Sequence, residues 1–319
     1  MNYTMNIKSI ISACGKAGYV NRFPVILLWL ALALSVSGCS KSKEGPKQEQ
    51  EQPSISEQLQ SLPFVATLEK AEHRQLVAGV DLYEVAFKNS TESPYALFIL
   101  RIDLKRDDLT LRTLTPKDEP EFGLQRVLDM AKLVNSSSRR VVAAVNGDFF
   151  EWTGKPWGPV VKDGNIIKGD FNAPDRNYFA IHQDKTLSIG GPGNFITGRA
   201  TIDQAIGGLE RTLRSGSLSS HPNTERHPRT LVGYTANKEV YLVVVDGRRS
   251  GYSGGFTHNE GGQLLKALGA VESLNLDGGG STTLVIEDPA TKQLVIKNRH
   301  SDASPRAVAN GLAIIQTAD

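Results

Sequence analysis

The segment that decides the fold and the site is residues 271–286, which read VESLNLDGGGSTTLVI. An apolar run from Val271 to Leu276 ends at an acid, and a second apolar run to Ile286 follows three glycines and three hydroxyl side chains. Glycine permits backbone angles and close approaches that other residues do not. The pattern therefore predicts that Asp277 is held at a strand end beside bare peptide N–H groups, which suits an anionic or sugar ligand. A tight hairpin that carries a surface acid is the competing interpretation.

Around this segment the sequence predicts an α+β domain with a strand-rich mixed sheet core and a few packed helices. Helical spacing occurs at 124–134 and again after Thr257, which forms a capping-box pattern with Glu260. An Asp-Gly pair at 163–164 predicts a hairpin. Further strands are expected at 81–87, 96–104, 109–114, 141–145, 231–234, 240–245, 273–276 and 312–315.

The amino terminus has the features of an export signal. Three basic residues precede an apolar run at 23–36, which is shorter than a membrane-spanning helix needs to be. The run closes with VSGCS at 36–40, which resembles a bacterial lipobox. We therefore expect cleavage before Cys39, lipidation of its thiol, and an extracytoplasmic protein anchored to the cell envelope, at the outer membrane or facing the periplasm. An uncleaved signal anchor is the alternative.

Cysteine content and composition support this organisation. The two cysteines, Cys14 and Cys39, both lie in the signal region, so the mature chain can form no internal disulfide. We predict a signal peptide at 1–38, a flexible tether at 39–64 and a catalytic domain at 65–319; Lys, Glu, Gln, Ser and Pro dominate the tether. A net charge of +2 without a basic stripe argues against nucleic acid as a partner.

Polar clusters stand at the ends of several predicted strands. Arginine matters among them because its planar guanidinium binds phosphate or carboxylate through two parallel hydrogen bonds. One surface arginine ordinarily carries a solvated charge, but three arginines at strand ends beside acids and glycines indicate an anion site. The clusters comprise Asn146 with Asp148, Arg229, Asp246 with Arg248, Asp277, and Arg306 with Asn310.

These clusters resemble, in their order and spacing, the phosphodiester glycosidase family. The resemblance covers residues 87–315, and the block at 275–282 is its most specific part, whereas 189–223 shows no family pattern and is a candidate specificity insert. The matching blocks are VNGDFF at 145–150, HPRT at 227–230, VDGR at 245–248 and NLDGGGST at 275–282, with Glu260, Arg306 and Asn310. The resemblance implies hydrolysis of a sugar-1-phosphodiester at the anomeric carbon, with a phosphosugar or glycan substrate and no cofactor.

The resemblance also implies a role for each residue. A phosphate ester is a good leaving group, so stabilising its negative charge matters more than protonating it. A carboxylate must activate water or attack the carbon, and Asp277 and Glu260 are the candidate catalytic residues, although a capping box alone explains Glu260. The implied substrate-binding residues are Asn146, Asp148, Arg229, Asp246, Arg248, Gly278, Gly279, Ser281, Thr282 and Arg306.

A serine esterase is one alternative. Residues 251–255, GYSGG, match the nucleophile-elbow pattern, and Asp277 and His300 follow Ser253 in the order that such hydrolases use. The elbow serine should follow its strand immediately, however, and residues 246–250 intervene here.

Two other classes remain open. A metal-dependent phosphodiesterase would use hard oxygen and imidazole ligands, although no H-E-x-x-H motif is present, so we leave the question of a metal open. A non-catalytic glycan-binding lipoprotein would use aromatic platforms, for which Trp152 and Trp157 are candidates beside core or loop-anchor roles. The candidate metal ligands are Asp148, Asp246, Asp277 and His227.

Overall fold

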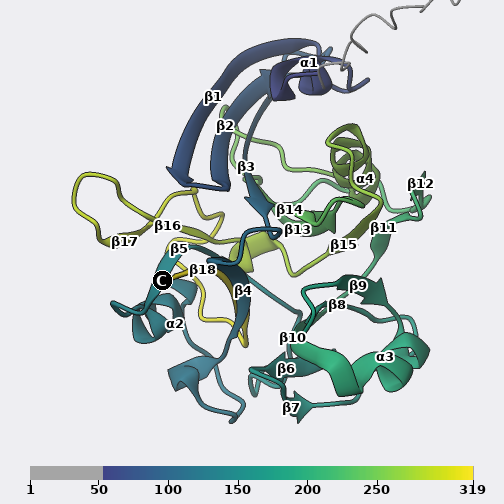
Figure 1. Cartoon of the computed structure of the whole chain (residues 1–319). Coiled ribbons are helices and arrows are strands. Elements are labelled where there is room, and N and C mark those ends of the chain that lie inside the picture. Colours follow the sequence, from purple (N-terminus) through teal and green to yellow (C-terminus); the bar gives the residue numbers. More distant parts are fainter. Residues whose placement is uncertain (1–52, 319) are drawn as a thin grey trace, which may run out of the picture. The chain divides into compact units, whose positions relative to one another are not determined.

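A computed structural model describes residues 53–318, whose strands form three antiparallel sheets with few helices (Figure 1). The predicted α+β class is confirmed. The expected mixed sheet is not found, because every pairing among the described strands is antiparallel. Short connections such as 89–93 and 235–238 allow only this arrangement, since a parallel pair needs a crossover of a dozen or more residues.

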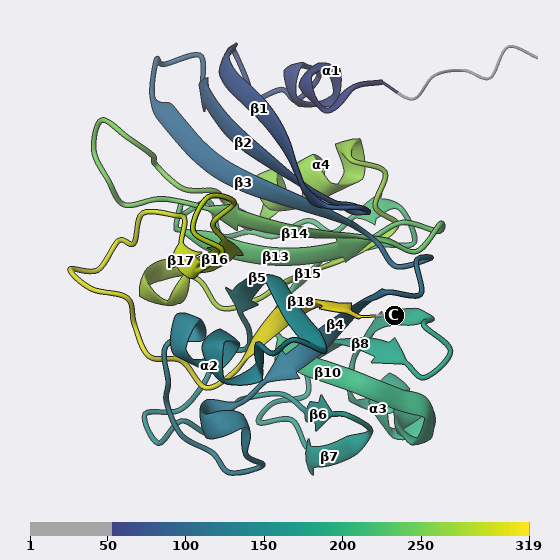
Figure 2. The same ribbon diagram turned by 60° about the vertical axis from the view of Figure 1, so that its left-hand side comes forward.

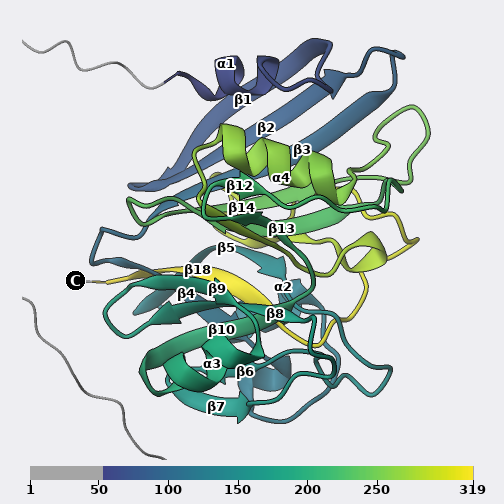
Figure 3. The ribbon, with the colours of Figure 1, turned by 90° about the vertical axis from the view of Figure 1, so that its right-hand side faces the viewer.

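The largest sheet has eight strands, and its two faces are covered differently. Alternate residues point to opposite faces: Val243 packs toward helices α1 (Ile55–Gln60) and α4 (His258–Ala267), and Val244 packs toward the second sheet. Figure 3 shows both helices beside this sheet. In spatial order the strands are β1 (Thr67–Val77), β2 (Val80–Lys88), β3 (Pro94–Asp103), β14 (Glu239–Val245), β13 (Arg229–Tyr234), β15 (Glu272–Asn275), β11 (Arg211–Arg214) and β12 (Ser217–Leu218).

The second sheet has five strands and lies next to the first (Figure 2). Val142 and Val145 pack into the core shared by the two sheets, whereas Val141 and Ala144 pack against helix α2 (Val127–Val134) on the outer face. In spatial order the strands are β17 (Leu294–Ile296), β16 (Leu284–Glu287), β5 (Arg139–Asn146), β18 (Gly311–Thr317) and β4 (Leu109–Leu114).

The third sheet also has five strands, and helix α3 (Pro192–Gly198) covers it through Phe195, which packs edge-on against Tyr178. The Asp-Gly hairpin predicted at 163–164 is confirmed as the turn between β6 and β7. In spatial order the strands are β7 (Asn165–Lys168), β6 (Val160–Lys162), β10 (Ile202–Gly208), β8 (Asn177–His182) and β9 (Leu187–Gly190). Three short 3-10 turns, η1 (Pro116–Asp118), η2 (Arg199–Thr201) and η3 (Gly279–Ser281), complete the elements.

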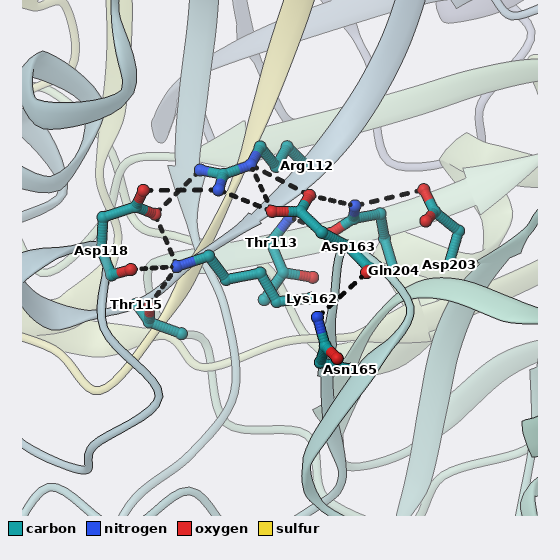
Figure 4. A network of polar contacts seen from close by, with 9 residues as sticks. All are labelled: Arg112, Thr113, Thr115, Asp118, Lys162, Asp163, Asn165, Asp203 and Gln204. Atoms are coloured by element: carbon teal, nitrogen blue, oxygen red, sulfur yellow. Dashed lines mark hydrogen bonds and ion pairs between the residues drawn. The ribbon is translucent and has the colours of Figure 1, made fainter.

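A charged network joins the second and third sheets (Figure 4). Arg112 on β4 forms ion pairs with Asp163 at 2.7 Å and with Asp118 at 2.8 Å, and Lys162 reaches Asp118 at 2.6 Å. Gln204 on β10 donates to Asp163 at 2.9 Å. The guanidinium of Arg112 is therefore buried between two carboxylates that neutralise it.

The folded part begins earlier than the sequence predicted. Ser54 caps α1 through a capping box with Glu57, and Leu59 and Leu62 are buried against the large sheet. The last residues of the predicted tether, which extends to 64, thus belong to the domain. The sequence did not reveal this because the segment is mostly polar, with one buried leucine in the short helix and one just after it.

The predicted signal peptide, the lipid-bearing Cys39 and the first part of the tether lie outside the described residues. Within 53–318, no helix has the length and apolar character that crossing a membrane requires.

Candidate active site

Several polar residues lie together at one end of the large sheet, where its central strands begin or finish. Arg229, the first residue of β13, lies opposite Val245 at the end of β14, and Leu231 lies opposite Asn275 at the end of β15. Because these strands are antiparallel, the start of β13 lies beside the ends of its two neighbours, β14 and β15. The blocks HPRT, VDGR and NLDGGG therefore meet there.

The second sheet brings its own polar end to the same place. Gly311 at the start of β18 lies opposite Asn146 at the end of β5. The Asn146 side chain donates to the Asp277 carbonyl at 2.7 Å, and the Asp277 N–H donates to the Gly147 carbonyl at 2.9 Å. These bonds join the strand ends of the two sheets directly behind Asp277.

A pocket of about 260 Å³ opens at this junction. It brings together Asp277 and the three arginines that the sequence singled out, and it adds an aromatic ring and a histidine. The lining residues are Phe149, His227, Pro228, Arg229, Arg248, Asp277, Gly278, Gly279, Gly280 and Arg306.

The glycines let side chains approach the backbone closely. Gly279 has a φ of +60°, and a Cβ there would lie 2.9 Å from Nη1 of Arg248. A Cβ on Gly280 would overlap Nη2 of Arg306 and the carboxylate of Asp302. The glycine turn thus provides the space in which two of the pocket arginines lie.

Asp277 has an unusual carboxyl group. Burial raises its pKa to about 6, while the Ser281 hydroxyl, the Gly278 N–H and the charge of Arg306 act in the opposite direction. The Gly278 N–H donates to the carboxylate at 2.8 Å, whereas the Ser281 hydroxyl lies close without a well-aligned hydrogen bond. A carboxyl that titrates near neutrality is suited to proton transfer or nucleophilic attack.

Asp148 lies behind the pocket and is not part of its lining. Its side chain is almost fully buried and accepts from the Gly158 N–H at 2.6 Å, while its other oxygen has no partner among residues 53–318. Burial raises its pKa to about 7, and the nearby charge of Asp277 acts in the same direction. The predicted substrate contact is therefore replaced by a buried acid that is electrostatically linked to Asp277.

Arg229 is the most buried of the pocket arginines. It donates to the carbonyl of Phe256 at 2.9 Å, to the carbonyl of Glu225 at 3.4 Å and to Nε2 of His258 at 2.6 Å. These bonds use three of the five guanidinium N–H groups and leave two, one on each terminal nitrogen. Burial lowers the pKa of Arg229 to about 10, since no acid in the described part of the chain forms an ion pair with it.

The other two arginines are more exposed. Arg248 lies 3.1 Å from Nδ1 of His227, and Arg306 pairs with Asp302 at 2.7 Å. Both line the same pocket as Arg229 and Asp277. All three predicted arginines therefore meet.

Two predicted residues have local structural roles instead. Asp246 accepts from Tyr252 at 2.9 Å, from the Asn298 side chain at 3.0 Å and from the Arg299 N–H at 3.0 Å, so it ties the 298–299 segment to the end of β14. Asn146, besides its bond to Asp277, accepts from Thr230 at 2.6 Å. Neither lines the pocket.

Glu260 is engaged in the capping box. Its carboxylate accepts from the Thr257 N–H at 2.8 Å and pairs with Arg226 at 2.5 Å, and it is absent from the pocket lining. The geometry favours the capping interpretation over the catalytic one. Ser281 and Thr282 are buried behind the glycines, and neither hydroxyl has a well-aligned partner within 53–318.

The serine esterase interpretation is wrong, because its triad does not assemble. Ser253 donates to the carbonyl of Asp246 at 2.5 Å and accepts from the N–H of Ala96 at 3.1 Å, both backbone groups. His300 instead contacts the Thr283 hydroxyl at 3.0 Å. Ser253 therefore connects the loop after β14 to strand β3 through these two hydrogen bonds.

The predicted metal ligands do not come together either. Within residues 53–318, the one group of three metal-ligating side chains whose atoms all lie within 4.8 Å is Glu210, His221 and His258. No local sequence pattern indicates this group, because its members come from three separate segments.

An aromatic platform borders the pocket. Phe149, a lining residue, stacks on Trp157 with ring centres 5.4 Å apart and planes tilted by 13°, and Arg176 lies 4.3 Å from the Trp157 ring centre. Trp152, the other tryptophan considered, is 90 % exposed and does not line the pocket. The aromatic face available to a ligand is that of Phe149, which no sequence pattern marked as a platform.

An acid of raised pKa, three arginines and an aromatic ring lie where the strand ends of two antiparallel sheets of an α+β domain meet, an arrangement suited to an anion. The phosphodiester glycosidase family model matches residues 139–315, which is more than half of the chain. The chain belongs to this family, and the resemblance predicted from the sequence is confirmed.

Individual relatives are distant. The mouse N-acetylglucosamine-1-phosphodiester alpha-N-acetylglucosaminidase is 27 % identical over 169 residues, which cover 45 % of this chain and 31 % of that protein. The SPbeta prophage-derived uncharacterized protein YomE of Bacillus subtilis (strain 168) is 25 % identical over 202 residues, covering 60 % of this chain and 29 % of that protein. The chain thus spans about a third of the length of these relatives.

Two solved structures share the fold. The catalytic domain of the zebrafish N-acetylglucosamine-1-phosphodiester alpha-N-acetylglucosaminidase, auto-inhibited by its pro-peptide, has a TM-score of 0.57 at 20 % identity over 77 % of this chain and 87 % of that one. A hypothetical protein from Synechocystis has a TM-score of 0.56 at 15 % identity over 78 % of this chain and 64 % of that one. At these identities the likeness concerns the fold alone.

Proposed function

We propose that this protein hydrolyses a sugar-1-phosphodiester at the anomeric carbon, on envelope or extracellular glycans. The observation that carries the proposal is one pocket that holds Asp277, whose pKa is raised to about 6, beside three arginines. One of these, Arg229, is a buried cation that forms no ion pair with a carboxylate of residues 53–318. A phosphate group would supply the missing negative charge.

The arginines would act on the leaving group. When the bond between the anomeric carbon and oxygen breaks, a phosphodiester leaves as a phosphomonoester whose oxygen gains negative charge. The two unused N–H groups of Arg229 form a fork for phosphate oxygens, and Arg248 and Arg306 add two further positive charges. Preorganised donors that meet developing charge lower the barrier without reorganisation.

Asp277 would act on the carbon. Above a pH of about 6 its carboxylate is ionised, and it either attacks the anomeric carbon or takes a proton from an attacking water. Phe149 offers an apolar face on which a sugar ring can stack, and the backbone of the glycine turn allows the ring to approach closely. An alpha-N-acetylglucosaminide is a candidate substrate, since the mouse relative is named for that bond.

A substrate panel tests this proposal. Wild-type protein is assayed on a sugar-1-phosphodiester, on an aryl glycoside of the same sugar, and on a phosphodiester that lacks the sugar. We expect turnover of the first and little of the others, because only the first fits both the arginines and the ring platform. Equal cleavage of the aryl glycoside would contradict the proposed substrate class.

The same substrates distinguish a hydrolase from a non-catalytic glycan-binding protein, whose sugar ligand could also stack on Phe149. Calorimetry with the sugar-1-phosphodiester would then show binding while no product accumulates. That outcome would replace the hydrolase proposal.

We also propose that the domain is tethered to the cell envelope through a lipid on Cys39. The support is the lipobox-like stretch at 36–40 after an apolar run. Mass spectrometry of detergent-extracted protein should show a diacylated Cys39 as the first residue. A soluble product cut at another position would contradict the anchor.

A further inference from the structure

A chain of hydrogen bonds extends from Arg229 away from the pocket. Nη1 of Arg229 lies 2.6 Å from Nε2 of His258, and Nδ1 of His258 lies 3.2 Å from Nδ1 of His221. Nε2 of His221 then lies 3.1 Å from a carboxylate oxygen of Glu210. The path therefore links a cation to an anion through two imidazole rings, and the other Glu210 oxygen lies 3.3 Å from Nε2 of His258, so the acid also adjoins the first ring.

Donor and acceptor chemistry fixes every proton along this path. Arginine can only donate, so Nε2 of His258 is an acceptor and the proton of that neutral ring sits on Nδ1. This proton can go only to Nδ1 of His221, which also accepts from the Asn223 N–H at 3.3 Å. His221 therefore carries its proton on Nε2 and donates it to Glu210.

The surrounding structure holds the path in place. His258 is the first residue of α4. The side chain of its neighbour Asn259 accepts from the His221 N–H at 3.0 Å and donates to the His221 carbonyl at 2.9 Å, which fixes the His221 backbone. Burial, followed by the charge of Arg229, lowers the pKa of His258 to about 3, which keeps the ring neutral. Glu210 and His221 both belong to 189–223, the segment in which the sequence showed no family pattern.

We propose that Glu210, His221 and His258 are positioning residues that orient the guanidinium of Arg229 toward a phosphate group of the substrate. The inference rests on the proposed function and adds a specific support for phosphate recognition. Nη1 of Arg229 is held by His258 on one side, which directs its remaining N–H group into the pocket. The carboxylate of Glu210, 3.3 Å from Nε2 of His258, offsets part of the arginine charge but forms no ion pair with Arg229 among the described residues, so a phosphate group can still meet the guanidinium.

The same three side chains, Glu210, His221 and His258, are close enough together to bind a metal ion. Their contacts with Arg229 favour the hydrogen-bonded path over a metal site. A metal ion at Nε2 of His258 would lie against the guanidinium at 2.6 Å, where two cations repel each other. Coordination there requires the arginine to leave its place in the pocket.

The first experiment needs no substrate. Long-range ¹H–¹⁵N NMR spectra of histidine-labelled protein report which imidazole nitrogen carries the proton. We expect the Nδ1–H tautomer for His258 and the Nε2–H tautomer for His221. The opposite tautomer at either ring would overturn the path, and so would stoichiometric Zn²⁺ binding at micromolar concentration that shifts both rings.

The second experiment compares two replacements of one side chain. His258→Gln retains an acceptor for Arg229, whereas His258→Leu removes it. We expect His258→Leu to lower kcat on the phosphodiester on the order of 10²-fold, as misplaced groups do, and His258→Gln to recover most of that loss. His182→Leu, at a partly buried histidine of the third sheet, is the matched control and should leave kcat unchanged.

The outcomes separate the inference from the proposed function. If the wild type turns over no phosphodiester, the function fails, and the tautomers still decide whether the path exists. If the wild type is active and His258→Leu, His258→Gln and His182→Leu all keep the wild-type kcat, the positioning role is refuted.

Discussion

Arg112 and Arg229 are two buried arginines with opposite surroundings. Their exposed fractions are 6 % and 5 %, so they lose similar amounts of hydration. Arg112 is met by the carboxylates of Asp163 and Asp118, which outweigh the effect of burial and raise its pKa above the usual value. Arg229 meets two carbonyls and a neutral imidazole, and burial lowers its pKa to about 10.

The difference separates a structural charge from one available to a ligand. A buried charge that is paired and fully hydrogen-bonded contributes to a single folded arrangement, while an unpaired one is costly to keep. Around Arg112 both signs are present within one network. Around Arg229 and Asp277 the charges remain available for a substrate, and four predictions test that contrast.

The largest effect is expected from Asp277→Asn. The amide is nearly isosteric but cannot act as base or nucleophile, so turnover of the phosphodiester should fall on the order of 10³-fold or more. The melting temperature should not fall, because the change removes a buried charge. Glu260→Gln keeps the capping box and should stay within a few-fold of wild type; steady-state kinetics of both variants against a fluorogenic phosphodiester measure the contrast.

Arg112→Met should do the reverse and damage stability alone. Removing one partner of a buried ion pair costs roughly 3–5 kcal/mol, and we expect about 2–3 kcal/mol here because Asp118 and Asp163 are 33 % and 46 % exposed. Urea unfolding measures the loss. The kcat of the folded fraction should be unchanged, and Lys88→Met, at a surface ion pair, should leave stability unaltered. A large fall in kcat would show that the network reaches the pocket.

Arg229→Lys keeps a positive charge but loses the fork. A single preorganised donor contributes on the order of 10²–10³-fold in rate, so kcat on the phosphodiester should fall by about that factor. Binding of the product sugar alone should be nearly unchanged in calorimetry. An equal loss on aryl glycosides and on phosphodiesters would mean that Arg229 does not meet phosphate.

The smallest effect concerns pH and stability. Asp148 and Asp277 have pKa values raised from 3.8 to about 7 and about 6, so the folded state holds protons that the unfolded state has released. Stability from these groups therefore falls as pH rises from about 4 to 7. Asp118 and Asp163 have lowered pKa values, and their contribution is lost as pH falls below about 4.

Melting curves between pH 5 and 8 check this sign. We expect the melting temperature of the wild type to fall by several degrees over that range through these two acids, and the fall to be smaller in Asp148→Asn. An unchanged slope in the variant would mean that Asp148 is ionised at neutral pH in the folded protein.

The sequence predicted much of this molecule where the signal is local. Apolar runs predicted β2 to β5, β13 to β15 and β18, whereas β1 and β8 to β12 were not predicted. The Asp-Gly pair marked a hairpin, and Thr257 with Glu260 marked the start of a helix. The pocket composition also followed, because Asp277 and the arginines stand at strand ends beside glycines.

Other features depend on pairing across the chain, which no local pattern reports. Asp246 directly follows strand β14, and Asp277 lies two residues after strand β15. Their positions in the sequence are thus similar, yet Asp246 contacts Tyr252 and Asn298 and does not line the pocket. His258 and Glu210 are 48 positions apart and meet only because helix α4 packs against strand β11, which begins beside Glu210. The division of the strands into three sheets is non-local in the same way.

The close approach at Gly280 has an evolutionary consequence. Because a side chain there would take the space of the Arg306 guanidinium and displace its flexible end, we expect these two positions to change together. In a lineage that acquires alanine at this glycine, the arginine would be displaced from its position in the pocket, and selection to keep it would then weaken. The two residues should therefore behave as one heritable character, and a relative that lacks both would mark a branch whose ligand has a different charge.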